Sequence, residues 1–216
     1  MKETSNQHIA ETLLDYGVAT DAKSPLVDGI QAYISLLLQW NRTISLTTVT
    51  DLEEIVRFHF GESFFAASAV PITGGRLADV GSGAGFPGLA LKMLIPTLDL
   101  ALIESNAKKA AFLEEVRRRI ELNSVFTFRG RMEDFDREHD SSSIVPFDFI
   151  TARAFGQFDE LLAWSAIHLA KAGKLLLWLG EEDAASISKM PGWLWEEPVR
   201  IPGSQRRYIL GGSVQE

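Results

Sequence analysis

From Gly75 onward, short apolar segments alternate with longer helical segments, and this alternation limits the chain to a small group of folds. The apolar segments predict strands at residues 76–80, 98–104, 125–129, 147–151 and 174–179. Helices are expected between them, at residues 85–95, 106–122 and 158–169. Repeated strand–helix units predict an α/β fold, with a mostly parallel sheet and helices on both faces. Residues 193–198 and 205–210 are expected to close the sheet as an antiparallel pair.

The first 74 residues have a helical pattern. Ser24 and Pro25 are typical of a helix start, and an apolar stripe at helical spacing follows them. A second helical run is expected over about residues 51–69. We therefore expect residues 1–74 to form a helical extension packed on a core of residues 75–216. The polar residues between 136 and 145 predict a surface loop.

The chain is acidic, with a net charge of −8 and an isoelectric point near 5.1. Taken alone, this acidity argues against nucleic-acid binding, which depends on Lys and Arg. Positive residues do gather in two runs on one predicted helix, Lys108–Lys109 and Arg117–Arg119. Either a local basic face or an ordinary solvated helix surface fits this pattern.

The composition also narrows the compartment and the chemistry. The chain has no cysteine, which excludes disulfides and thiolate metal sites. The N-terminus lacks a signal-peptide apolar stretch, and no apolar run reaches membrane-spanning length. The four histidines show no ligand spacing. We expect a cytoplasmic protein with no membrane segment and no metal.

A glycine-rich turn follows the first predicted strand, in the sequence Asp79-Val80-Gly81-Ser82-Gly83-Ala84-Gly85-Phe86-Pro87-Gly88. Three alternating glycines in this position favour a ligand-binding loop over an ordinary turn. Residues 83–88 match the dinucleotide motif G-x-G-x-x-G. The strand ends at Val80, however, so the turn begins at Gly81 and reads D-x-G-x-G-x-G. This frame, with an acid at Asp79 that suits an ammonium group directly or through water, favours S-adenosylmethionine.

Two later segments fit the same ligand. Glu104 ends the second predicted strand, 21 residues after Gly83, where a carboxylate can accept both ribose hydroxyls; an acidic helix cap is the alternative. The turn at residues 130–135 follows the third strand and can border an adenine, with Met132 packed on its face. A polar loop with one buried methionine fits that turn equally well.

Three further blocks, together with the glycine loop, carry a family resemblance. They are Trp40-Asn41 with Leu46-Thr47, His59 with Glu62-Ser63, and Phe147-Asp148 with Arg153-Ala154-Phe155. In this order the blocks resemble the ribosomal small-subunit methyltransferase G family, also called GidB. The resemblance spans about residues 32–180. It implies a Rossmann-like methyltransferase fold and methyl transfer from S-adenosyl-L-methionine to guanine N7 in 16S rRNA, alone or within the small ribosomal subunit.

The resemblance and the loop together give a set of expected site residues. The cofactor is expected to contact Asp79, Gly81, Gly83, Gly85, Phe86, Glu104, Met132 and Glu133. Arg153 is expected to face the methyl-accepting nucleotide and to contact guanine O6 or a phosphate, because N7 must stay free; a surface or capping role is the alternative. His59 and Glu62 could reach the mouth of the pocket, but we prefer to interpret them as a buried pair that joins the helical extension to the sheet.

Some positions depart from the family pattern. Ser45 replaces an asparagine, Glu62 an aspartate and Ala152 a serine, and the family's lysine before Gly180 is missing. These departures weaken the expectation of RNA contact more than that of cofactor binding. Two other functions therefore stay open: an NAD-dependent oxidoreductase and a non-catalytic nucleotide-binding protein.

Overall fold

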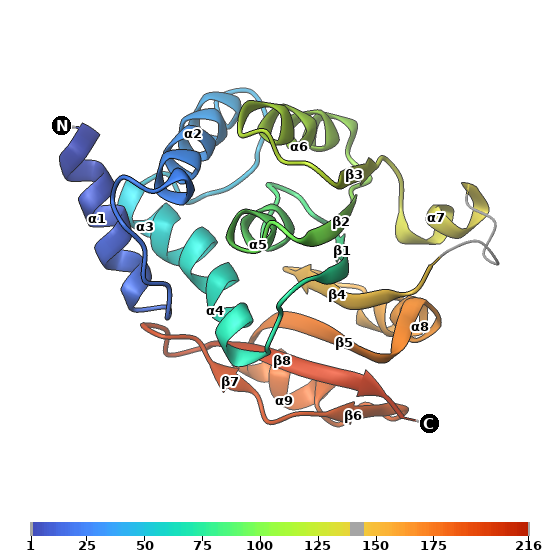
Figure 1. Cartoon of the computed structure of the whole chain (residues 1–216). Helices are drawn as coiled ribbons and strands as arrows, with labels where there is room; N and C mark the ends of the chain where they lie inside the picture. The colour runs from blue at the N-terminus through green and yellow to red at the C-terminus, as the bar shows by residue number, and fades with distance from the viewer. Residues whose placement is uncertain (1, 139–144, 216) are drawn as a thin grey trace.

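The computed structural model describes residues 2–138 and 145–215, and a single mixed sheet runs through its centre (Figure 1). The strands are β1 (Gly75–Val80), β2 (Leu98–Ile103), β3 (Val125–Phe128), β4 (Phe147–Arg153), β5 (Leu169–Gly180), β6 (Trp193–Trp195), β7 (Val199–Arg200) and β8 (Arg207–Val214). Their order is β3-β2-β1-β4-β5-β8-β6, with β7 also paired to β8. β1 to β5 pair in parallel, and β6 to β8 pair antiparallel. The predicted parallel sheet with an antiparallel edge is confirmed.

Helices connect the strands and form the N-terminal segment. They are α1 (Lys2–Leu14), α2 (Pro25–Trp40), α3 (Leu52–Ile55), α4 (Glu62–Ala69), α5 (Gly88–Leu94), α6 (Ala107–Arg119), α7 (Met132–Glu138), α8 (Phe158–His168) and α9 (Glu181–Ile187), with a π-helix, η1 (Val56–Gly61), between α3 and α4. Two helices, α7 and α9, were not predicted. Residues 136–138, expected in a loop, belong to α7, and residues 139–144 of that loop lie outside the described residues.

Helices cover the sheet on both faces, because successive side chains of each strand point in opposite directions. On β2, Leu100 and Leu102 join one buried cluster, and Ala101 and Ile103 join the other. The first cluster contains residues of α2, α4, α5 and α6, and the second contains residues of α7, α8 and α9. This arrangement confirms the doubly covered α/β sheet.

The helices before β1 pack on the first face of the sheet. Ser24 caps α2 by accepting a hydrogen bond from the Val27 amide at 3.3 Å, as its position before a proline predicts. Tyr33 of α2 stacks on Phe86 of the glycine loop, with ring centroids 5.1 Å apart. The N-terminal helices and the sheet therefore share one apolar core, and this core reaches the back of the glycine loop (Figure 1).

The helical run at residues 52–69 is not one regular α-helix. Its middle turn, η1, has the wider i→i+5 hydrogen bonding of a π-helix. His59 lies within η1, and Glu62 begins the α-helix that follows. Periodicity predicted the helix but not this change of pitch, which sets the directions of both side chains.

The described helices include none with the length and apolar character that crossing a bilayer requires.

Candidate functional site

The glycine loop leaves β1 at its carboxyl end and continues to Pro87, so α5 begins at Gly88 rather than at the predicted residue 85. Its glycines at 81, 83 and 85 have φ values of +70°, +55° and +86°. At Gly85 a Cβ would lie 2.1 Å from the Tyr33 hydroxyl. That hydroxyl donates a 2.6 Å hydrogen bond to the Ala84 carbonyl oxygen. Gly85 therefore lets α2 approach and hold the loop from behind.

Asp79 lies beneath the loop and is buried. Its carboxylate accepts hydrogen bonds from the Thr151 hydroxyl at 2.8 Å and from the Gly88 amide at 3.2 Å. Burial raises the pKa of Asp79 to about 7, against the opposing effect of these hydrogen bonds. The side chain thus ties the end of the loop to β4, the strand beside β1.

Glu104 follows the end of β2 and is also buried. One carboxylate oxygen accepts from the Gly83 amide at 2.8 Å, and the other accepts from the Asn106 amide at 2.7 Å. A carboxylate has about four acceptor positions, so about two remain for a ligand. Glu104 both anchors the glycine loop and keeps acceptors for a diol.

A cavity of about 140 Å³ opens beside this loop, at the carboxyl ends of β1, β2 and β4 and the start of α7. Its wall includes Gly81, Ile103, Met132, Glu133 and Phe155. In open parallel sheets, ligands bind at this end of the strands. We call this the first cavity.

A second cavity of about 240 Å³ adjoins it beyond Phe155, which lines both. Its wall comes from the end of β4, the end of β5, the start of α4 and the start of β8. The charged groups on this wall are Glu62, Arg153, Asp183 and Arg207. The first cavity borders the glycine loop and includes Arg131 and Glu133 in its wall, whereas the charged residues of the second include an ion-pair cluster.

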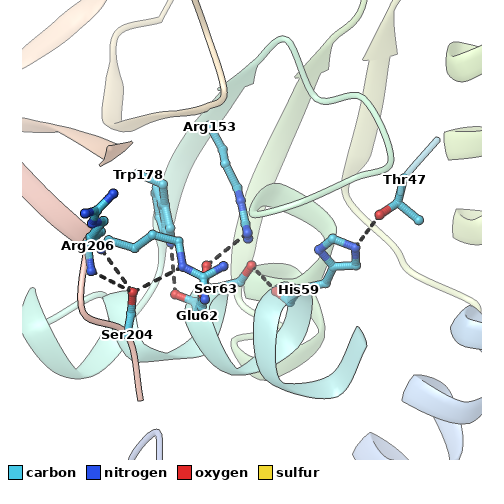
Figure 2. A network of polar contacts seen from close by, with 9 residues as sticks. Thr47, His59, Glu62, Ser63, Arg153, Trp178, Ser204 and Arg206 are labelled. Carbon is cyan, nitrogen blue, oxygen red and sulfur yellow. Dashed lines mark hydrogen bonds and ion pairs between the residues drawn. The ribbon is translucent and has the colours of Figure 1, made fainter. Parts of the chain in front are cut away.

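Glu62 holds the charged groups of the second cavity together. Its side chain is only 2% exposed, and its two oxygens each lie 2.9 Å from a guanidinium nitrogen, one of Arg153 and one of Arg207. Burial raises the pKa of Glu62, and the two guanidinium groups oppose that shift. Trp178 donates its indole N–H to the Glu62 carbonyl oxygen at 3.0 Å, which fixes the start of α4 against β5 (Figure 2).

Arg153 reaches Glu62 from the end of β4 (Figure 2). Its Nη2 makes the ion pair, but its buried Nη1 has no hydrogen-bond partner among the described residues. A buried donor without a partner costs about 1–3 kcal/mol, and more when it is charged. Arg153 also lines the second cavity, so an acceptor bound there could complete this donor once the side chain turns toward it.

His59 does not pair with Glu62. Its Nε2 lies 2.9 Å from the Thr47 hydroxyl (Figure 2). Its ring stacks on Phe86 with centroids 4.7 Å apart. Burial lowers the pKa of His59 to about 3, with a further contribution from Arg153, so the ring is neutral at pH 7. His59 packs between the N-terminal helices and the glycine loop. The expected His59–Glu62 pair is wrong, and both residues join the extension to the sheet through other partners.

The expected cofactor residues fall into three groups. Gly81, Met132 and Glu133 line the first cavity. Gly83 and Glu104 bond to each other next to it, since Ile103 and Ser105 on either side of Glu104 line the wall. Asp79 lies behind the loop and holds it in place, whereas Gly85 and Phe86 belong to the loop and pack against Tyr33 behind it.

Three residues with clear roles were not in the expected set. Arg207 completes the ion-pair cluster, Thr151 binds Asp79, and Tyr33 supports the loop. Phe155, a member of one of the family blocks, is partly exposed and lines both cavities. The position of Arg207 at the start of the last strand gave no motif to identify it.

Across residues 2–138 and 145–215, no cluster of three or more His, Cys, Asp or Glu side chains is arranged to hold a metal ion.

Comparison with known proteins gives a consistent result. A family model described as rRNA small subunit methyltransferase G matches residues 27–192. A Desulfitobacterium hafniense protein named ribosomal RNA small subunit methyltransferase G is 38% identical over 156 residues; the alignment covers 72% of this chain and 64% of that protein. A Xanthomonas euvesicatoria protein of the same name is 34% identical over 205 residues, covering 88% of this chain and 93% of that protein.

Solved structures share the fold at low sequence identity. A ribosomal protein L11 methylase from Lactobacillus delbrueckii superposes with a TM-score of 0.58 at 15% identity, over 72% of this chain and 78% of that one. The expected Rossmann-like methyltransferase fold is therefore confirmed.

Proposed function

Because the chain belongs to the rRNA small subunit methyltransferase G family, we propose that it transfers a methyl group from S-adenosylmethionine to guanine N7 in 16S rRNA. Two adjoining cavities support this reaction, since Phe155 lines both and a group could pass from one ligand to the other beside it. The observation that carries the proposal is the unpartnered buried donor of Arg153 on the second cavity.

The first cavity and its surroundings fit the cofactor. The remaining acceptor positions of Glu104 suit the two ribose hydroxyls, and Met132 and Glu133 suit the adenine. Gly81 and Gly83 bring the backbone close to the ligand, and Asp79 is proposed to act on the ammonium group through the loop or a water. When bound, S-adenosylmethionine supplies an electrophilic methyl group.

The second cavity fits a guanine. Arg153 Nη1 can donate to guanine O6, which leaves N7 free, and Phe155 offers an aromatic face for the base. The 16S rRNA, alone or in the small ribosomal subunit, is the proposed partner. A base reached in this way must be unstacked from its neighbours in the RNA.

The chemistry requires positioning rather than proton transfer. Guanine N7 carries a lone pair in the plane of the base and no proton, so its methylation needs no general base. Glu62, the buried carboxylate of the second cavity, is engaged by two guanidinium groups. Alignment of the two reacting atoms can contribute about 7–11 kcal/mol in well-oriented cases.

A methyl-transfer assay tests the proposal. The protein is mixed with S-adenosylmethionine and small ribosomal subunits that lack the modification, and the digested RNA is searched for N7-methylguanosine by mass spectrometry. Its appearance only in the presence of active protein would support the function. Binding of S-adenosylmethionine without N7-methylguanosine would overturn the proposed acceptor, and binding of NAD instead would overturn the proposed cofactor.

A further inference from the structure

Arg207 is the outermost charged group of the ion-pair cluster. It begins β8, and its side chain is 37% exposed, compared with 19% for Arg153. Both line the second cavity and both bind Glu62. Arg153 thus lies deeper in the cavity wall, and Arg207 lies at its rim.

Three contacts hold the Arg207 guanidinium in one orientation, and a fourth fixes its backbone. Its Nη2 pairs with Glu62 at 2.9 Å, and its Nε donates to the Ser204 hydroxyl at 3.3 Å. Its plane lies over the Phe58 ring, 4.3 Å from the centroid. The Ser204 hydroxyl also accepts from the Arg207 amide at 3.0 Å, which fixes the start of the strand. Nη1 has no partner among the described residues, so a pre-oriented donor remains available at the rim.

The cluster carries more positive than negative charge. Two guanidinium groups share one carboxylate, which leaves the cluster with one excess positive charge. Asp183 also lines this cavity, so the formal charges of the four charged lining residues balance. Arginine can donate two parallel hydrogen bonds to phosphate oxygens. Phosphate contacts position a nucleic acid but do not distinguish its sequence. The rim position and the oriented donor therefore match a phosphate better than a base edge.

We infer that Arg207 binds a backbone phosphate of the RNA next to the methyl-accepting nucleotide, while Arg153 serves the base. Glu62 would then position both arginines with one carboxylate. This inference rests on the proposed function and goes beyond it. It assigns a second substrate contact to a residue outside the sequence segments that carry the family resemblance.

The test compares Arg207→Ala with Arg206→Ala. Both variants remove one positive charge at neighbouring positions, but Arg206 is exposed and does not line the cavity. Methylation of small ribosomal subunits that lack the modification is measured at several salt concentrations. For Arg207→Ala we expect KM for the subunit to rise about tenfold or more, because a charge-assisted contact is lost. The magnitude of the slope of log KM against log salt should fall by about one, while kcat is retained. Arg206→Ala should match the wild type.

Two controls separate this contact from a purely structural role. Affinity for S-adenosylmethionine, followed by tryptophan fluorescence, reports whether each variant is folded and loaded. Arg207→Lys keeps a charge for Glu62 and for a phosphate. Its salt slope should therefore match that of the wild type, and its KM should lie between those of the wild type and Arg207→Ala. Equal KM values and slopes for Arg207→Ala, Arg206→Ala and the wild type would overturn the inference, as would a loss confined to kcat. A wild-type protein that methylates no subunit would instead contradict the proposed function.

Discussion

The first and second cavities meet at Phe155 but use different kinds of groups. The first is shaped by the glycine loop, whose conformation depends on backbone hydrogen bonds and on Tyr33 behind it. The second is shaped by side chains from β4, α4 and β8, which meet through ion pairs. Both pockets therefore bring together distant segments, but only the first includes a loop that a local sequence motif identifies.

Two buried carboxylates show the same difference. Asp79 lies under the loop with hydrogen-bond donors only, and burial raises its pKa to about 7. Glu62 is almost as buried, but two guanidinium groups oppose the rise in its pKa. A carboxylate can be kept in a protein interior by neutral donors or by cations, and only the second arrangement brings guanidinium groups to a cavity wall.

Removal of Glu62 should have the largest effect, because it leaves the Arg153 and Arg207 guanidinium groups close together without their shared carboxylate. For Glu62→Ala we expect the free energy of unfolding to fall by about 3–5 kcal/mol, measured by urea denaturation. Glu62→Gln has the same shape and keeps one acceptor oxygen, so its loss should be smaller. A loss below 1 kcal/mol for the alanine variant would mean that the cluster does not hold α4 and β8 together.

Removal of Arg153 should impair methyl transfer to the ribosomal subunit without weakening cofactor binding. Arg153→Ala is expected to lower kcat/KM for the ribosomal subunit about 100-fold, because the base loses its positioning donor. Its affinity for S-adenosylmethionine, measured by calorimetry, should stay within twofold of the wild type. Arg153→Lys retains a charge for Glu62 and should fold normally, yet it lacks the planar fork and should remain impaired. Equal losses in cofactor affinity and turnover would break the contrast between the cavities.

Glu104→Ala is the matching change on the cofactor side. We expect the Kd for S-adenosylmethionine to rise about tenfold or more, because hydrogen bonds to a charged acceptor are lost. The variant also frees the Gly83 amide, so the loop loses one anchor. KM for the ribosomal subunit at saturating cofactor should be unchanged. An unaltered Kd would remove Glu104 from the proposed cofactor site.

The effect of Asp79→Asn on the free energy of unfolding should depend on pH and should be smaller than that of Glu62→Ala. The pKa of Asp79 is raised in the folded state, so its stabilising contribution is complete below the unfolded pKa, near 4, and is lost as the pH rises through about 7. The asparagine variant does not titrate in this range. Relative to the wild type, it should gain stability of about 2–3 kcal/mol between pH 5 and pH 8. Urea denaturation of both proteins at these two pH values measures the difference, and a constant difference would show that Asp79 is ionised throughout.

The cofactor side was largely predictable from the sequence because its signals are local. The order of strand, glycine turn and helix, with Glu104 at the end of the next strand, predicted the sheet and the ligand-binding edge correctly. Asp79, Gly85 and Phe86 belong to the same motif but face the protein interior. A motif gives the residues of a loop, whereas their orientation depends on what packs behind them, and here that includes Tyr33.

The acceptor side was only partly predictable because its contacts span long stretches of chain. Arg153 follows β4 and was expected near the substrate, but Glu62 was paired with the wrong residue. Its partners Arg153 and Arg207 lie 91 and 145 residues away, so no local spacing connects them. Arg207 becomes informative only once β8 is placed antiparallel to β5, which brings its first residue to Gly180.

The direction of the Glu62 side chain depends on the helical register set by the π-helical turn η1. Each residue advances an α-helix by about 100°, so deletion of one residue before Glu62 would swing its carboxylate away from both arginines. Most single substitutions leave a helix face intact, but a three-nucleotide deletion here would dismantle an ion-pair cluster without changing any of its members. In laboratory evolution or natural drift, this stretch should therefore accept exchanges of residues far more readily than changes of length.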